Sequence, residues 1–173
     1  AESAWARGMG DATRKKFGAV DVLINNASLM SVLPRRSWLE ISEDAWDRVM
    51  AVNLRGLFLC CRAVFAAMRE KGRGKIVNIS SSRVWEGNPN RLHYTTSKAG
   101  VIGFTRALAR EVAEFGSTVN AVTPGLTLSD TPVASSSNNY PAAPAAGRAI
   151  ARPLVPADRG GAGLWRNGDA GAL

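Results

Sequence analysis

Residues 75–98 read KIVNISSSRVWEGNPNRLHYTTSK, and the predicted fold is built around this stretch. The apolar run at its start predicts a buried strand over 75–80. A loop rich in turn-forming residues follows over 83–92, and apolar residues at helical spacing then predict a helix over 93–115. The stretch therefore predicts a strand–loop–helix unit, with serines 80–82 where the strand ends.

Tyr94 and Lys98 lie one turn apart in the predicted helix, so their side chains share a face. A free tyrosine has a pKa of about 10, which is too high for a base at neutral pH. The Lys98 ammonium favours the phenolate, so we expect it to lower the pKa of Tyr94. Ser81, upstream at the strand end, can hold a carbonyl or alcohol oxygen against the phenol. These residues predict a proton-transfer centre for alcohol and ketone chemistry.

Four further segments stand in order around the pattern Ser-x12-Tyr-x3-Lys that these residues form. They are DVLINNAS at 21–28, VNLRG at 52–56, KIVNISSS at 75–82 and VNAVTPG at 119–125. Over roughly residues 1–132 the chain resembles the short-chain dehydrogenase/reductase family, and five ordered segments make the resemblance specific. It implies an α/β fold, a Rossmann-like doubly wound parallel sheet in three αβα layers.

The resemblance also implies roles for individual residues. Tyr94 is the general acid/base, Lys98 lowers its pKa and holds the nicotinamide ribose, and Ser81 positions the substrate oxygen. Asn53 joins them as a catalytic residue that holds a water linking Lys98 to solvent. The residues expected to bind the cofactor are Asn26, Ala27, Tyr94, Lys98, Pro124, Gly125 and Thr127, with Ser129 a weaker candidate.

Each of these residues also has a purely structural interpretation. Tyr94 could be an aromatic residue at the core edge, Lys98 a solvated charge and Asn53 a satisfied core amide. Ser80 and Ser82 compete with Ser81, which the spacing to Tyr94 favours. The remaining neighbours, which could line a substrate pocket or only adjoin it, are Trp85, Leu92 and His93.

The rest of the chain predicts a small set of further elements. We expect a helix over 1–17, a buried strand over 20–25 and a loop over 29–41. We also expect a helix that runs from its N-cap Ser42 to about 69, and a third strand over 119–122. Residues 131–173 begin with a segment rich in Ser, Pro and Ala and are expected to form a flexible flap and an atypical tail.

Three parts of the family pattern are not found in this sequence. The opening strand with its Gly-x3-Gly-x-Gly turn is missing, and so are the next strand and the last one. We therefore expect 1–173 to be a single, partial Rossmann-like domain. Strand 20–25 corresponds to the family's fourth strand, so it should present an unpaired apolar edge that favours aggregation. The chain alone is expected to be poorly stable.

Composition narrows the functional classes. The chain has 173 residues and a net charge of +8, but its Lys and Arg residues are scattered without interleaved aromatic residues, so we expect no nucleic-acid partner. No apolar run approaches the ~20 residues of a membrane span and no signal peptide is evident, so we expect no membrane partner and a cytoplasmic location. Because the sequence has one histidine and no ligand spacing, we expect no metal site. Cys60 and Cys61 are neighbours in a predicted helix, where they rarely pair, so we expect reduced thiols.

Two functions follow as alternatives. In the first, the chain is an NAD(P)-dependent oxidoreductase acting on a small-molecule secondary alcohol or ketone, similar to 3-oxoacyl-carrier reductases or alcohol dehydrogenases. The cofactor is NAD or NADP, and the strand end that decides between them is absent. The resemblance implies a homo-oligomer for the full-length protein, a dimer or tetramer built through helices 43–69 and 93–115. In the second, the chain is a catalytically inactive truncated remnant that acts only by association with partners.

Overall fold

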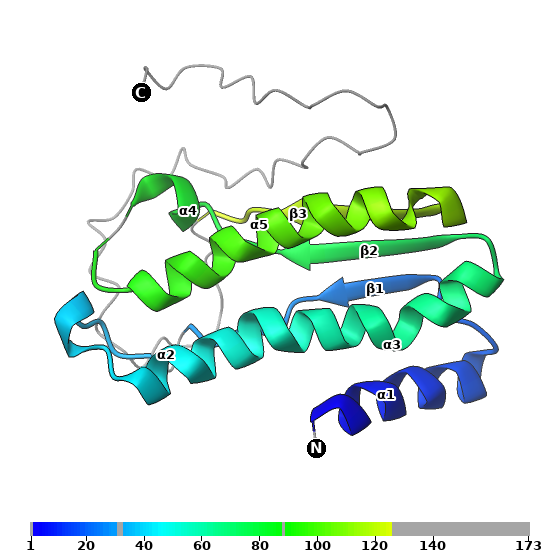
Figure 1. The fold of residues 1–173 in the computed structure, drawn as a ribbon, viewed down its shortest axis with the longest axis horizontal. Helices are drawn as coiled ribbons and strands as arrows, with labels where there is room; N and C mark the ends of the chain where they lie inside the picture. Colours follow the sequence, from blue (N-terminus) through cyan, green and yellow to red (C-terminus); the bar gives the residue numbers. More distant parts are fainter. Residues whose placement is uncertain (1, 31–32, 88, 126–173) are drawn as a thin grey trace, which may run out of the picture.

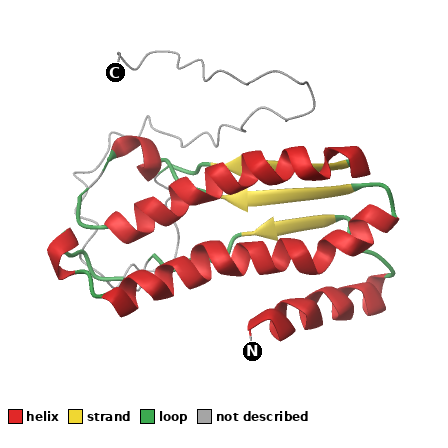
Figure 2. Cartoon of the chain, in the orientation of Figure 1, coloured by secondary structure: helices red, strands yellow, loops and turns green. Residues whose placement is uncertain are grey.

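The computed structural model describes residues 2–30, 33–87 and 89–125 of the chain. Three strands alternate with helices along the sequence (Figures 1 and 2). In chain order the elements are α1 (Glu2–Phe17), β1 (Val22–Asn25), the 3-10 helix η1 (Trp38–Glu40), α2 (Glu43–Met50), the π-helical segment η2 (Ala51–Gly56), α3 (Leu57–Glu70), β2 (Gly74–Ile79), α4 (Arg83–Glu86), α5 (Leu92–Val112), the 3-10 helix η3 (Ala113–Phe115) and β3 (Ser117–Val122).

The strands form one parallel sheet in the order β1-β2-β3. Leu23 pairs with Ile76, and Ile76 pairs with Val119, so the carboxyl ends of all three strands meet at one edge. The helices between successive strands run back along the sheet, which is how parallel neighbours are connected (Figure 1). The α/β class and a part of the Rossmann-like arrangement are thereby confirmed.

One face of the sheet packs on α3 and α5. The strand residues that point to this face alternate along each strand and are buried, among them Leu23, Ile76 and Val119. α1 packs beside α3, and a Cβ on Gly10 would stand 3.2 Å from the Ala63 carbonyl oxygen, so glycine allows this close approach. The apolar core contains Val20, Leu23, Leu57, Cys61, Val64, Met68, Ile76, Val101, Ala109, Val112 and Val119.

The opposite face of the sheet carries Val22 and Ile24, which are 51% and 62% exposed. In the part of the chain that the structure describes, helices cover the first face only, so two of the three expected αβα layers are seen there. Among the same residues β1 pairs with β2 alone, which places it at an edge of the sheet. This agrees with the expected apolar edge.

The predicted helix after Ser42 is one continuous helical run, Glu43–Glu70, with the π-helical segment η2 inside it. Ser42 Oγ accepts a hydrogen bond from the Ala45 N–H, as an N-cap should. By length and composition alone this run is apolar enough to cross a membrane, which the sequence prediction missed. Core helices meet the same criterion, and Val49, Leu57 and Met68 are buried in the fold.

Two expected loops contain short helices. In the loop over 29–41, Ser37 and Glu40 form a capping box that stabilises η1. In the loop over 83–92, Ser82 Oγ donates to Glu86 Oε1 at 2.6 Å, and α4 ends at Gly87 with a left-handed φ of 62°. Both signals are local and could have been read from the sequence.

Candidate functional site

The candidate site lies at the edge where the parallel strands end, because β2 runs directly into Ser80 and Ser81 there. The first turns of α5 pass beside this edge and carry Tyr94 and Lys98 (Figure 1). Ser80 N–H donates to the Val122 carbonyl at 2.7 Å, which extends the sheet by one more hydrogen bond. The strand–loop–helix unit therefore brings together side chains that are 13 and 17 residues apart in the chain.

The three consecutive serines have different partners. Ser80 Oγ donates to the Lys98 carbonyl at 2.7 Å, so it ties the strand end to α5. Ser82 Oγ is bound to Glu86 in α4. Ser81 is the serine whose hydroxyl bonds the Tyr94 phenol, and it is 7% exposed. The structure thus brings Ser81, and neither neighbour, to Tyr94.

Tyr94 is 5% exposed, and burial raises the pKa of its phenol above the ordinary value of 10.0. The Ser81 hydrogen bond and the charges of Arg83 and Arg91 act in the opposite direction but do not outweigh burial. The prediction that Lys98 lowers the pKa of Tyr94 is wrong for this arrangement. The reason is burial, which is the largest effect on the phenol and acts against ionisation.

Lys98 is 3% exposed, so it is not a solvated charge. Its Nζ donates to the Ile79 carbonyl at 2.8 Å and lies 5.8 Å from the centroid of the Tyr94 ring. Burial lowers the pKa of Lys98 from 10.5 to about 8. The ammonium is therefore near the phenol but held by the end of β2.

Asn53 lies in the π-helical segment η2 and is 2% exposed. Its Oδ1 accepts from the Leu29 N–H at 2.8 Å, and its Nδ2 donates to the Leu29 carbonyl at 3.3 Å and to Ser97 Oγ at 2.9 Å. Both amide N–H groups are thus in use, and one lone pair of Oδ1 is left for a water. These contacts favour the core-amide interpretation, and the expected water relay stays a prediction.

The predicted cofactor residues flank the same edge. Asn26 and Ala27 are exposed directly after β1. Pro124 and Gly125 are half-buried after β3, and the Pro124 carbonyl accepts from the Ser82 N–H at 3.0 Å. Thr127 and the weaker candidate Ser129 lie outside the described residues, as does the expected flap and tail over 131–173.

A network of hydrogen bonds between polar side chains of the core was missed by the sequence analysis. Asn25 Nδ2 donates to Asn78 Oδ1 at 2.8 Å and also contacts the Cys61 sulfur at 3.3 Å. Asn78 Nδ2 donates to Thr105 Oγ1 at 3.0 Å, and Thr105 donates on to the Val101 carbonyl at 2.7 Å. The network joins β1, β2, α3 and α5. The sequence did offer a signal for it, because each of two apolar strands contains an asparagine, and a buried amide needs hydrogen-bond partners.

A buried arginine whose charge acts on the phenol was also missed by the sequence analysis. Arg91, at the start of α5, is 3% exposed and donates from Nη1 to the Met30 carbonyl at 2.7 Å. His93 is 5% exposed, and burial together with Arg91 lowers its pKa, which keeps the imidazole neutral. His93 is thus a buried neighbour of Tyr94.

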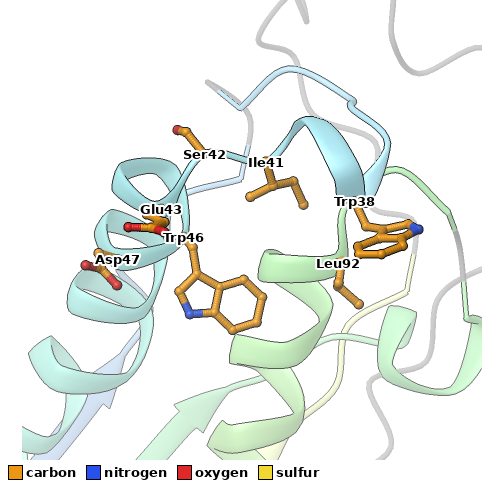
Figure 3. A pocket seen from close by; sticks show the side chains of 7 residues that line it. All are labelled: Trp38, Ile41, Ser42, Glu43, Trp46, Asp47 and Leu92. Carbon is orange, nitrogen blue, oxygen red and sulfur yellow. The ribbon is translucent and has the colours of Figure 1, made fainter.

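A hollow of about 400 Å³ opens on another side of α5 (Figure 3). Its apolar lining comes from four places in the chain: Trp38 in η1, Ile41 in the loop after it, Trp46 in α2 and Leu92 in α5. Leu92 and Tyr94 are two positions apart in a helix, so their side chains point about 200° away from each other. The hollow is therefore separate from the candidate site, and Leu92 lines it instead of the site. The lining residues are Trp38, Ile41, Ser42, Glu43, Trp46, Asp47 and Leu92.

Comparison with known proteins points to one family. The family model described as short chain dehydrogenase matches residues 3–140. The (2S)-[(R)-hydroxy(phenyl)methyl]succinyl-CoA dehydrogenase subunit BbsD of Thauera aromatica is 46% identical over 119 residues, which cover 69% of this chain and 46% of that protein. The 3-oxoacyl-[acyl-carrier-protein] reductases of Synechocystis sp. and Staphylococcus epidermidis are 44% and 43% identical, over 68% and 66% of this chain and 47% and 46% of their own lengths. The chain thus spans about half the length of the curated relatives it matches.

Proposed function

Because the chain belongs to the short-chain dehydrogenase family, we propose that it carries the catalytic centre of an NAD(P)-dependent oxidoreductase acting on a secondary alcohol or ketone. One observation carries the proposal. The Ser81 hydroxyl bonds the Tyr94 phenol at the carboxyl edge of the sheet, and the Lys98 ammonium lies 5.8 Å from the same ring. A phenol, a hydroxyl and a cation that meet at one edge of the sheet suit proton transfer to a carbonyl oxygen.

The donors at this edge fit a nicotinamide nucleotide. The Lys98 ammonium and the Tyr94 hydroxyl are suited to ribose hydroxyls, and strand ends at the carboxyl edge of a parallel sheet are where such ligands bind. The cofactor supplies the hydride when it is bound. The residues proposed to hold it are Asn26, Ala27, Tyr94, Lys98, Pro124, Gly125 and Thr127.

The protonation state of Tyr94 favours one direction of the reaction. Its raised pKa keeps the phenol protonated at neutral pH, so Tyr94 can give a proton to a ketone oxygen that Ser81 also holds. In the reverse direction the phenol must first lose its proton before it can accept that of an alcohol. We therefore expect ketone reduction at neutral pH and a rate of alcohol oxidation that rises towards alkaline pH.

For the substrate we propose a 3-oxoacyl or related hydroxyacyl thioester. Two of the relatives are named for reduction of a 3-oxoacyl group on a carrier protein, and a third for oxidation of a hydroxyl on a CoA thioester. An alcohol dehydrogenase activity on simpler secondary alcohols is the broader form of the same proposal. Either NAD or NADP is a candidate for the cofactor. We also propose a cytoplasmic location, and a homo-oligomer for the full-length protein.

The alternative is a remnant without catalytic activity. The chain spans about half the length of its relatives, and its sequence lacks the Gly-rich turn whose amides hold the cofactor pyrophosphate in the family. Each lost charge-assisted hydrogen bond is worth about 1.5–3 kcal/mol, so two or three would weaken binding about a thousandfold or more.

Fluorescence titration with NADH and NADPH, followed by reduction of a 3-oxoacyl thioester, tests the proposal. In the active protein we expect Tyr94→Phe to lower kcat by about 10²–10⁴-fold, because the phenol proton is lost while the ring still packs. The exposed control Thr96→Ala should leave kcat, the melting temperature and the cofactor affinity unchanged. No cofactor binding at millimolar concentration would support the remnant instead.

A further inference from the structure

Ser97 stands between Tyr94 and Lys98 in α5 and is fully buried. Its Oγ donates to the Tyr94 carbonyl at 2.7 Å and accepts from Asn53 Nδ2 at 2.9 Å. The hydroxyl therefore joins the main chain of the Tyr94–Lys98 turn to the side chain of a residue 44 positions away. A serine in the middle of a helix usually bonds its own backbone only, so this second bond calls for an explanation.

Asn53 extends the connection to a third element. Its amide forms two hydrogen bonds with Leu29, one to the N–H and one to the carbonyl, in the manner of a strand partner. Leu29 follows Asn26 and Ala27 in the loop after β1. The path from this loop to the Tyr94 carbonyl is thus continuous through Asn53 and Ser97, and Asn53 and Ser97 are at most 2% exposed.

The π-helical geometry of η2 belongs to the same arrangement. Ala51–Gly56 is the segment of the long helix that departs from α-helical geometry, and it contains Asn53. π-helical turns interrupt the regular spacing of side chains and occur often at functional sites. A side chain that departs from α-helical spacing here can reach both Leu29 and Ser97, and its three hydrogen bonds stabilise the irregular turn in return.

We propose that Ser97 is a positioning residue which, through Asn53, clamps the Tyr94–Lys98 turn of α5 to the loop after β1. The proposal rests on the proposed function in that Tyr94 is taken as the proton donor and the loop as part of the cofactor site. The clamp sets the distance between the two sides of the site, which come from different elements. It gives Asn53 a structural task that is distinct from the predicted water relay.

Two measurements that need no turnover test the clamp in Ser97→Ala. Amide hydrogen exchange of Leu29, followed by NMR, should become about tenfold faster, which corresponds to the loss of one buried hydrogen bond. Ultraviolet titration of Tyr94, taken as the difference from the same protein with Tyr94→Phe, should move to lower pH, because a loosened turn admits water to the phenol. Asn53→Ala should move the Tyr94 titration in the same direction, although the hydrogen bonds described for the Asn53 side chain go to Leu29 and Ser97 and not to Tyr94.

The matched control is Ser117→Ala. Ser117 is also buried, at 4% exposure, but its Oγ has no hydrogen-bond partner among the described residues. Its removal should leave both Leu29 exchange and the Tyr94 titration unchanged. If Ser97→Ala leaves either readout at the wild-type value, the proposal is overturned. A wild-type protein without turnover would refute the proposed function alone, since neither readout depends on catalysis.

Discussion

At Tyr94, burial and neighbouring charges act on the phenol in opposite directions. Burial dominates and raises the pKa of the phenol, while Ser81, Arg83 and Arg91 partly compensate. The Lys98 Nζ lies 5.8 Å from the centroid of the Tyr94 ring and donates to the Ile79 carbonyl. A lysine one turn away is thus not enough to make a tyrosine acidic. Burial of the phenol decides the direction of the shift.

Lys98 itself gives a prediction for stability. Its folded pKa of about 8 lies below the ordinary 10.5, so between these values the unfolded chain binds more protons and the free energy of unfolding rises with pH. The cost of the buried ammonium is fully present below pH 8. From pH 7 to pH 9, we expect the wild type to gain about 1 kcal/mol relative to Lys98→Met.

Urea unfolding of both proteins across this range measures the difference. Cys60, Cys61 and Tyr94, whose pKa values are raised by burial, titrate in both proteins and cancel in the comparison. A constant difference between pH 7 and pH 9 would show that Lys98 is not buried as described.

At the scale of elements, polar contacts fix how α5 sits on the sheet. The hydrogen bond from Asn78 in β2 to Thr105 is buried and joins the strand that leads into Ser81 to α5, which carries Tyr94. Such a bond is directional, unlike the apolar contacts around it, so it can set the register of the helix on the strand. The geometry of the site therefore depends on residues that are remote from it.

Thr105→Val tests this contact with little change in shape. It leaves the Asn78 amide without its acceptor in the core, so we expect a loss of about 1–3 kcal/mol in the free energy of unfolding. Thr96→Val, at an exposed position of the same helix, is the control and should change stability by less than about 0.5 kcal/mol. Equal effects of the two substitutions in urea unfolding would contradict the role given to this bond.

The turn into β3 depends on Gly116. Its φ of +68° is left-handed, and an added Cβ would fall on the Gly72 carbonyl oxygen. Gly116→Ala should therefore cost about 2 kcal/mol or more. Gly8→Ala, in α1 with open space around it, should instead stabilise by about 0.5–1 kcal/mol. Thermal unfolding checks both, and a neutral Gly116→Ala would mean that the turn is built differently.

At the scale of the whole molecule, the sheet has two unlike faces. One packs on α3 and α5, and the other presents Val22 and Ile24 on a strand that is an edge among the described residues. An apolar edge strand is a template for association with further strands. We therefore expect the isolated chain to self-associate, and its low stability remains a prediction.

Ile24→Lys should reduce this association without unfolding the protein. Ile24 is 62% exposed, so the free energy of unfolding should change by less than about 0.5 kcal/mol while light scattering falls. Ile76→Lys on the next strand is the contrast, because Ile76 is fully buried and an unpaired charge there should prevent folding. Unchanged scattering in Ile24→Lys would place the associating surface elsewhere.

The sequence by itself determined the family, the order of the strands and helices, and the spacing of Ser81, Tyr94 and Lys98. These features depend on local patterns: apolar periodicity, the Ser42 cap and the left-handed glycine at Gly116 can each be recognised over a few residues. Short range is also why the capping box of η1 was readable, although the prediction passed over it.

Only the tertiary structure decided which serine meets the phenol, where the Lys98 Nζ points and what Asn53 binds. Each of these depends on atoms from elements far apart in the chain, such as Leu29 and Ser97 around Asn53. The direction of the Tyr94 pKa shift likewise follows from burial, which is a property of the packed core. Spacing along a chain specifies which groups can meet, whereas packing specifies the distances and the water around them, and proton affinity depends on those.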